Sequence, residues 1–101
     1  MNLIPGIQRI TGDAQIGPVG TVSVPKPIRL FSVSLISGAS ASTLTLRDGT
    51  STGATANEQV DGNASQSVTK NYAGGLRFPN GLFADADANI SYATFSFTEE
   101  C

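Results

Sequence analysis

The sequence predicts an all-β protein: a small antiparallel β-sandwich or jelly-roll-like barrel with an extended N-terminal arm. About seven or eight short segments have strand-like apolar patterns, and turn signals separate them at a spacing typical of sandwiches and barrels. No segment shows the apolar spacing of a long amphipathic helix. Charged residues make up only 14% of the 101 residues. A chain of this length and composition supports one domain with one core.

The first twenty residues differ from the rest, so we divide the chain into an arm, residues 1–20, and a β-sandwich domain, residues 21–101. Pro5 and Gly6 interrupt the helical spacing of the neighbouring apolar residues, which favours an extended chain. A frayed terminus is the alternative. The isoleucines favour an arm that lies on a surface, and its predicted contacts with a partner or another subunit are Leu3, Ile4, Ile7, Arg9 and Ile10.

The strands of the domain follow in order. The strongest pattern is Arg29–Ile36, where Phe31, Val33 and Leu35 are expected on the core face. Pro79-Asn80-Gly81 predicts a tight hairpin, because Asn-Gly tolerates the positive φ values of such a turn. The other predicted strands are Thr21–Val24, Thr43–Arg47, Ala54–Val60, Ser65–Tyr72, Leu76–Phe78, Leu82–Ala84 and Ile90–Thr98.

Several strands carry large apolar residues at adjacent positions, as in Leu30-Phe31, Leu35-Ile36 and Leu82-Phe83. Adjacent residues of a strand point to opposite faces, so these positions place apolar groups on both sides of a sheet. Either a loop or arm, or another subunit, is expected to cover the second face. We therefore expect a homo-oligomer, with Leu82, Phe83 and Tyr92 as further contact residues. The aromatic residues other than Phe83 and Tyr92 are assigned to the core.

The chemistry available to the chain is narrow. It has no His and no Trp, and its one Cys is the last residue, Cys101. Nucleophile activation by histidine and zinc binding both need residues that are absent. Asp85–Asn89 resembles the start of a calcium loop, but Ile90 stands where glycine is needed. We expect no enzyme, no cofactor and no metal, and Cys101 remains either a free thiol or half of an intersubunit disulfide.

Charge and hydropathy restrict the partners. The net charge is −2, and the arginines are scattered, so no nucleic-acid surface is expected. No apolar run approaches the roughly 18 residues of a membrane span, so no membrane partner is expected. No export signal is recognisable at the start.

Three blocks of the sequence resemble small head decoration (cement) proteins of tailed bacteriophages, particularly marine phages and cyanophages. The similarity runs from Phe31 to Phe97, and the residues that carry it are Ser32–Gly38, Leu44–Thr50 with Gly53, Gly75–Phe83, and Asn89–Tyr92. The resemblance implies a virion structural protein that is made in the host cytoplasm and sits on the capsid exterior. It implies binding to the major capsid protein, self-association as a trimer, and an N-terminal arm that touches the shell.

A second class of binding module fits the same pattern. A phage tail-fibre or receptor-binding domain that recognises host surface glycans would use the same sandwich, with the loops Asp48–Gly53 and Asp61–Ala64 as its contact surface. A head–tail connector subunit is a third possibility. The apolar arm and the absence of Trp favour decoration over these two.

Overall fold

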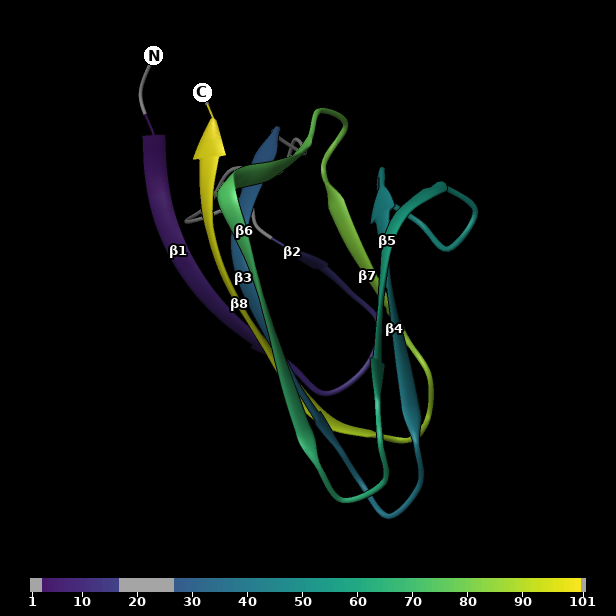
Figure 1. The fold of residues 1–101 in the computed structure, drawn as a ribbon. Helices are drawn as coiled ribbons and strands as arrows, with labels where there is room; N and C mark the ends of the chain where they lie inside the picture. The colour runs from purple at the N-terminus through teal and green to yellow at the C-terminus, as the bar shows by residue number, and fades with distance from the viewer. Residues whose placement is uncertain (1–2, 17–26, 101) are drawn as a thin grey trace.

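The computed structural model describes residues 3–16 and 27–100. They form eight strands in two antiparallel sheets that pack face to face (Figure 1). Sheet A has the order β1-β8-β3-β6, and sheet B has the order β2-β7-β4-β5. The strands are β1 (Leu3–Ile10), β2 (Ala14–Ile16), β3 (Ile28–Ser37), β4 (Ser42–Asp48), β5 (Thr55–Gly62), β6 (Ser67–Phe78), β7 (Leu82–Ala86) and β8 (Ile90–Glu100). The predicted all-β sandwich is confirmed.

The strand order is that of a jelly roll. Four pairs are nested within one another along the chain: β1 with β8, β2 with β7, β3 with β6, and β4 with β5. The chain is therefore arranged as one long hairpin that is rolled up into two sheets. Every pair of consecutive strands except β4 and β5 changes sheet. An eight-stranded double sheet of this kind is a jelly roll; strand alternation alone could not distinguish it from other Greek-key sandwiches.

The core lies between the two sheets and follows the two-residue period of the strands. On β4, Leu44 and Leu46 are buried, and Thr43 and Thr45 lie on the outer side. Both sheets contribute to one cluster of buried apolar side chains: Ile10, Ile16, Ile28, Leu30, Val33, Leu35, Leu44, Leu46, Val60, Phe78, Leu82, Ala84, Ile90, Ala93, Phe95 and Phe97. Because the two sheets share this core, neither has an apolar interior of its own.

The described part of the predicted arm, residues 3–16, belongs to the sandwich. It is extended, as expected, but β1 pairs with β8 along its whole length and β2 pairs with β7. Ile10 and Ile16 are 5% and 1% exposed in the core. The physical reason is that the edge strands of both sheets come from this segment, so its isoleucines cover the chain's own core. A free arm over residues 1–20, separate from a domain that begins at residue 21, does not describe this segment.

Phe31 does not lie in the core, contrary to prediction. The register of β3 shifts between Leu30 and Ser32 against both of its neighbours, and this shift marks a β-bulge. An extra residue in a strand resets its inward and outward alternation. Leu30 and Val33 are therefore buried, and Phe31 is 37% exposed.

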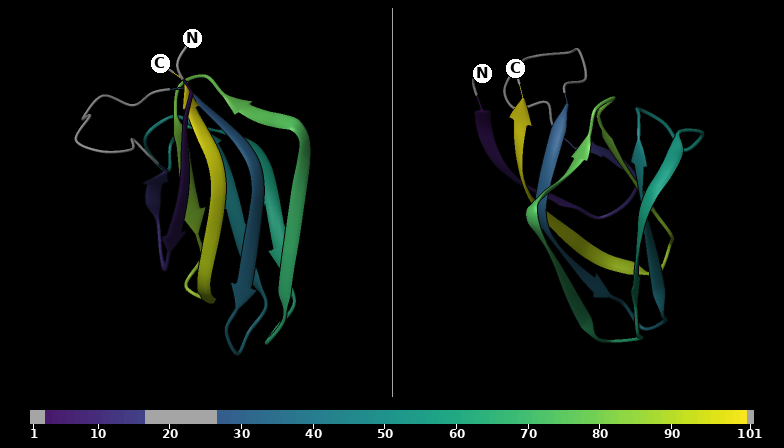
Figure 2. Two further views of the ribbon diagram at one scale, coloured as in Figure 1. Left: turned by 90° about the vertical axis from the view of Figure 1, so that its left-hand side faces the viewer. Right: turned by 45° about the horizontal axis from the view of Figure 1, so that its top comes forward.

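The partner of this bulge is an irregular stretch in β6. Four residues of β6 lie between Asn71 and Leu76, opposite the single residue Phe31. Gly74 and Gly75 have φ values of 77° and 87°, which L side chains rarely adopt. Figure 2 shows the resulting bend near the end of β6.

The turn at Pro79-Asn80-Gly81 is present, but it is not a hairpin. The Gly81 amide donates to the Phe78 carbonyl at 3.2 Å, and Gly81 has a φ of 101°. However, β6 lies in sheet A and β7 lies in sheet B, so the turn connects the two layers. An Asn-Gly sequence predicts that the chain reverses direction at this point. It does not predict which strands the two flanking strands pair with. The predicted strand Thr21–Val24 lies outside the described residues.

Candidate interaction surfaces

The outer face of sheet A presents short hydroxyl side chains in register. Ser34 lies between Thr94 of β8 and Thr69 of β6, and its Oγ is 3.0 Å from Thr69 Oγ1. Ser32 lies beside Ser96 in the next outward row. These aligned rows are made of small hydroxyl side chains, and the exposed Phe31 lies on β3 of the same sheet. Such a surface suits contact with another broad surface.

One corner of this face has a different composition. Ile7 on β1 is 79% exposed. Arg9 follows on the same side of the strand, with its guanidinium carbon 4.3 Å from the centroid of the Tyr92 ring. A cation over an aromatic face is worth about 0.5–1 kcal/mol at an exposed site. We call Ile7, Arg9 and Tyr92 the β1 patch.

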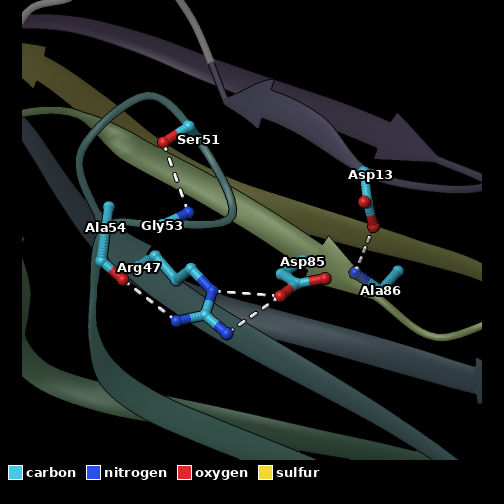
Figure 3. Close-up of polar contacts among 7 residues, drawn as sticks. All are labelled: Asp13, Arg47, Ser51, Gly53, Ala54, Asp85 and Ala86. Carbon is cyan, nitrogen blue, oxygen red and sulfur yellow. Dashed lines mark hydrogen bonds and ion pairs between the residues drawn. The ribbon is translucent and has the colours of Figure 1, made fainter.

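The outer face of sheet B is organised around an ion pair. Arg47 of β4 donates through Nε and Nη2 to Asp85 Oδ2 of β7, both at 3.0 Å (Figure 3). Its Nη1 donates to the Ala54 carbonyl at 2.9 Å. Both side chains are about a quarter exposed, at 23% and 26%. One guanidinium thus joins two strands and the end of the β4–β5 loop.

Acidic residues flank this pair at the sheet edge. Asp13 Oδ1 accepts the Ala86 amide at 2.7 Å, just beyond the point where β2 stops pairing with β7 (Figure 3). The Asp13 carboxylate thus accepts the Ala86 amide in place of a backbone carbonyl that a longer β2 would supply. Phe83 is half-buried on the outer side of β7 and lies opposite Gln15. We call Phe83, Asp85 and Asp13 the β7 patch.

The acidic turn before β8 caps backbone amides. Asp87 accepts the Thr43 amide through Oδ2 at 2.8 Å and the Asn89 amide through Oδ1 at 2.9 Å. Within residues 3–16 and 27–100, no group of three or more His, Cys, Asp or Glu side chains is placed to hold a metal ion. The same residues enclose no pocket. No helix among them is long and apolar enough to cross a membrane.

The predicted contact residues whose side chains the structure describes separate into three groups. Ile7, Arg9 and Tyr92 come together in the β1 patch, and Phe83 lies on the opposite face of the sandwich. Ile10 and Leu82 are 5% and 0% exposed, so their prediction as contact residues is wrong. Each takes an inward position on its strand, where alternation places it in the core. The Leu3 and Ile4 side chains and Cys101 lie outside what the structure describes.

The two loops predicted as a glycan surface are far apart. The β4–β5 loop, residues 49–54, lies at one end of β5, and residues 63–66 lie at the other (Figure 1). The eight residues of β5 separate the two ends by about 26 Å, at about 3.3 Å per residue. The Asp48–Gly53 and Asp61–Ala64 segments therefore do not form one contact surface.

The sequence did not predict the ion pair between Arg47 and Asp85 on sheet B. The alternation of the predicted strand Thr43–Arg47 puts Arg47 on the side opposite Leu44 and Leu46, and Asp85 follows the predicted strand Leu82–Ala84. Their ion pair depends on the β4–β7 register, in which Thr45 is opposite Asp85 and Arg47 is opposite Phe83. An outward arginine in a chain with few charges was the available signal, but nothing local identified its partner.

One titratable group has a clearly shifted pKa. Tyr72 of β6 points toward the core with its hydroxyl buried, near Glu58 of β5. Burial and, secondarily, the Glu58 carboxylate raise the pKa of Tyr72 to about 12. Both effects disfavour the tyrosinate ion in the folded protein.

No known protein-family model, curated protein or solved structure matches the chain.

Proposed function

We propose that this protein is a virion structural protein that works by binding: a decoration protein on the outer surface of a phage head, where it contacts major capsid subunits and stabilises them. The observation that carries the proposal is an eight-stranded jelly roll whose outer face in sheet A carries rows of hydroxyl side chains. Jelly rolls recur in viral capsid and lectin domains. The resemblance to phage decoration proteins selects the capsid from these uses.

The physical requirement of such a role is modest. A contact of standard size buries about 800 Å² on each partner. Many such contacts repeated over a shell act multivalently, so moderate single contacts suffice for stable attachment. Because residues 3–16 are strands of both sheets, we place the shell contact on the folded domain and not on a free arm.

The copy number of the protein in purified virions tests the proposal. Quantitative mass spectrometry of virions from the phage that encodes this chain gives the ratio to the major capsid protein. A ratio near one copy per capsid subunit supports shell-wide decoration. A few copies per particle would indicate a tail or portal protein and contradict the proposal, as would complete absence.

A further inference from the structure

The β1 patch and the β7 patch lie on opposite faces of the sandwich but at the same edge and the same end. The connection between β1 and β2 has only three residues, 11–13, and the connection between β7 and β8 has three, 87–89. Short connections between sheets place β1 over β2 and β8 over β7. Arg9 is one residue from the end of β1, and Asp13 immediately precedes β2.

The two patches are complementary in charge and in apolar character. The β1 patch has one cation, Arg9, beside the exposed Ile7. The β7 patch has two carboxylates, one of which is paired with Arg47, beside the half-buried Phe83. Opposite charges facing one another guide association and set its register.

We propose that the β1 patch of one copy docks on the β7 patch of a second copy, so that the outer face of sheet A lies on the outer face of sheet B. Shifting one copy along the sheet normal, without rotation, brings β1 and β8 of that copy over β2 and β7 of the next. Arg9 then faces Asp13 and Asp85, and Ile7 faces Phe83. This contact uses the outer face of sheet A that carries the proposed capsid contact, so a copy makes one of the two contacts at a time, and self-association is tested without the capsid.

The geometry determines the kind of assembly. The two patches are different surfaces, so the contact is heterologous, and heterologous contacts close into rings only if the rotation between copies permits. Here the two faces point in opposite directions, so successive copies form an open stack and not a closed trimer. The stack is weak, because four strands about 4.8 Å apart and about 26 Å long give a face of roughly 500 Å². Burying two such faces falls at the low end of specific interfaces, below about 1,200 Å² in total.

The test measures average molecular mass by light scattering, using the full-length protein alone with a reductant that keeps Cys101 from forming disulfides. Concentration runs from about 20 µM to about 1 mM, a range that detects weak association. At about 20 mM NaCl we expect the mass to rise steadily without a plateau. At about 500 mM NaCl we expect the monomer mass, because screening shortens the range of the charges. A constant monomer mass at low salt, or a plateau at a dimer or trimer, would overturn the proposal.

Charge-swapped variants test the pairing of the patches. R9E places glutamate against the carboxylates of the next copy, and D13R places arginine against Arg9. Each variant alone is expected to associate about tenfold more weakly, because like charges then face one another. An equimolar mixture is expected to recover association, since both contacts between unlike variants are again between opposite charges. Asp13 is chosen over Asp85 because Asp85 holds Arg47 through two contacts, whereas Asp13 accepts the exposed Ala86 amide at the sheet edge.

R77E is the matched control. Arg77 is exposed on the same outer face of sheet A, but on β6 at the opposite edge and outside the β1 patch, and its reversal changes the net charge by the same amount as R9E. It therefore tests whether association depends on the β1 edge and not on the charge of the whole face. We expect R77E to retain most of the association. If R77E weakened association as much as R9E, or if the mixture of R9E and D13R failed to recover while circular dichroism showed both folded, the assignment of these patches would be wrong.

Discussion

The polar residues on the outer faces of the two sheets make different kinds of contact. On sheet B, Arg47 binds the Ala54 carbonyl, and Gln15 binds the Leu82 and Gly49 carbonyls at 3.0 and 3.4 Å. These side chains connect loops and strands of the same molecule. On sheet A, the Ser34–Thr69 pair and the Arg9–Tyr92 pair join side chains to side chains across neighbouring strands. Arg29 of β3 differs from these pairs, because its Nη1 donates to the Gly74 carbonyl of β6 at 3.0 Å.

This difference separates polar residues that stabilise the fold from those available for contact. Removing a side chain that satisfies a buried or half-buried backbone carbonyl leaves that carbonyl without its partner, which costs stability. Removing an exposed side chain that contacts only another side chain costs little. Sheet B should therefore be sensitive to surface substitutions, and sheet A should tolerate them except at Arg29, which binds the Gly74 carbonyl.

The largest expected effect lies beneath both faces, in the shared core. Phe95 of β8 is fully buried, and Phe95→Ala should lower the free energy of unfolding by about 3–5 kcal/mol. Denaturant unfolding followed by circular dichroism and by tyrosine fluorescence measures the loss. Because one core joins the two sheets, both signals should change in a single transition. Separate transitions for the two probes would mean that the two sheets unfold independently and do not share one core.

The next largest effect is expected within sheet A, at the bend of β6. Gly75→Ala should cost about 2 kcal/mol or more, because its φ of 87° is strained for alanine and its Cβ would overlap the side chain of Arg29. Gly74→Ala is the matched control, since its φ is 77° but a Cβ there meets nothing within 4 Å. We expect about 1 kcal/mol for that control. Urea unfolding of both variants measures the difference, and equal losses would show that the overlap with Arg29 is relieved at no cost.

The fold was predictable where local alternation decides it, and unpredictable where a distant partner does. The strand over residues 43–47 follows from Leu44 and Leu46 alone. Phe31 was misplaced because the bulge that turns it outward depends on Gly74 and Gly75, more than 40 residues later. The turn at Asn80 was found, but its strands belong to different sheets for reasons that lie in β3 and β4.

The contact residues were only partly predictable, because their exposure depends on which sheet each segment joins. Ile7 and Ile10 are the same residue type in the same segment, yet one is 79% exposed and the other 5%. They lie three positions apart, so a strand sends them to opposite faces. The prediction grouped them because it did not assign that segment to a sheet. Asp13 had no local signal, since its role depends on where β2 stops pairing with β7.

A substitution on each outer face tests whether the polar contacts of sheet B contribute more to stability than those of sheet A. Arg47→Met removes the ion pair with Asp85 and the bond to the Ala54 carbonyl, and should cost about 1–2 kcal/mol. Arg9→Met, its counterpart on sheet A, should cost about 0.5 kcal/mol, because only an exposed contact with Tyr92 is lost. Thermal and urea unfolding of the two variants measure both values. If Arg9→Met lowered the free energy of unfolding as much as Arg47→Met, the two faces would not differ in their sensitivity to surface substitutions.

At neutral pH, the smallest effect is expected at the edge where β5 of sheet B approaches β6 of sheet A, and this effect grows only at high pH. The pKa of Tyr72 is raised to about 12 in the folded protein, against an ordinary value of about 10. A raised folded-state pKa means that the folded protein holds this proton more tightly than the unfolded chain. The stabilisation is therefore complete below pH 10 and is lost as the pH rises from about 10 to about 12.

Tyr72→Phe should leave stability nearly unchanged at neutral pH and flatten the decline over this range. Stability at several alkaline pH values, with Tyr92→Phe as the control that keeps the decline, measures it. A decline that is identical in wild type and Tyr72→Phe would show that ionisation of this hydroxyl is not what loosens the edge between the two sheets.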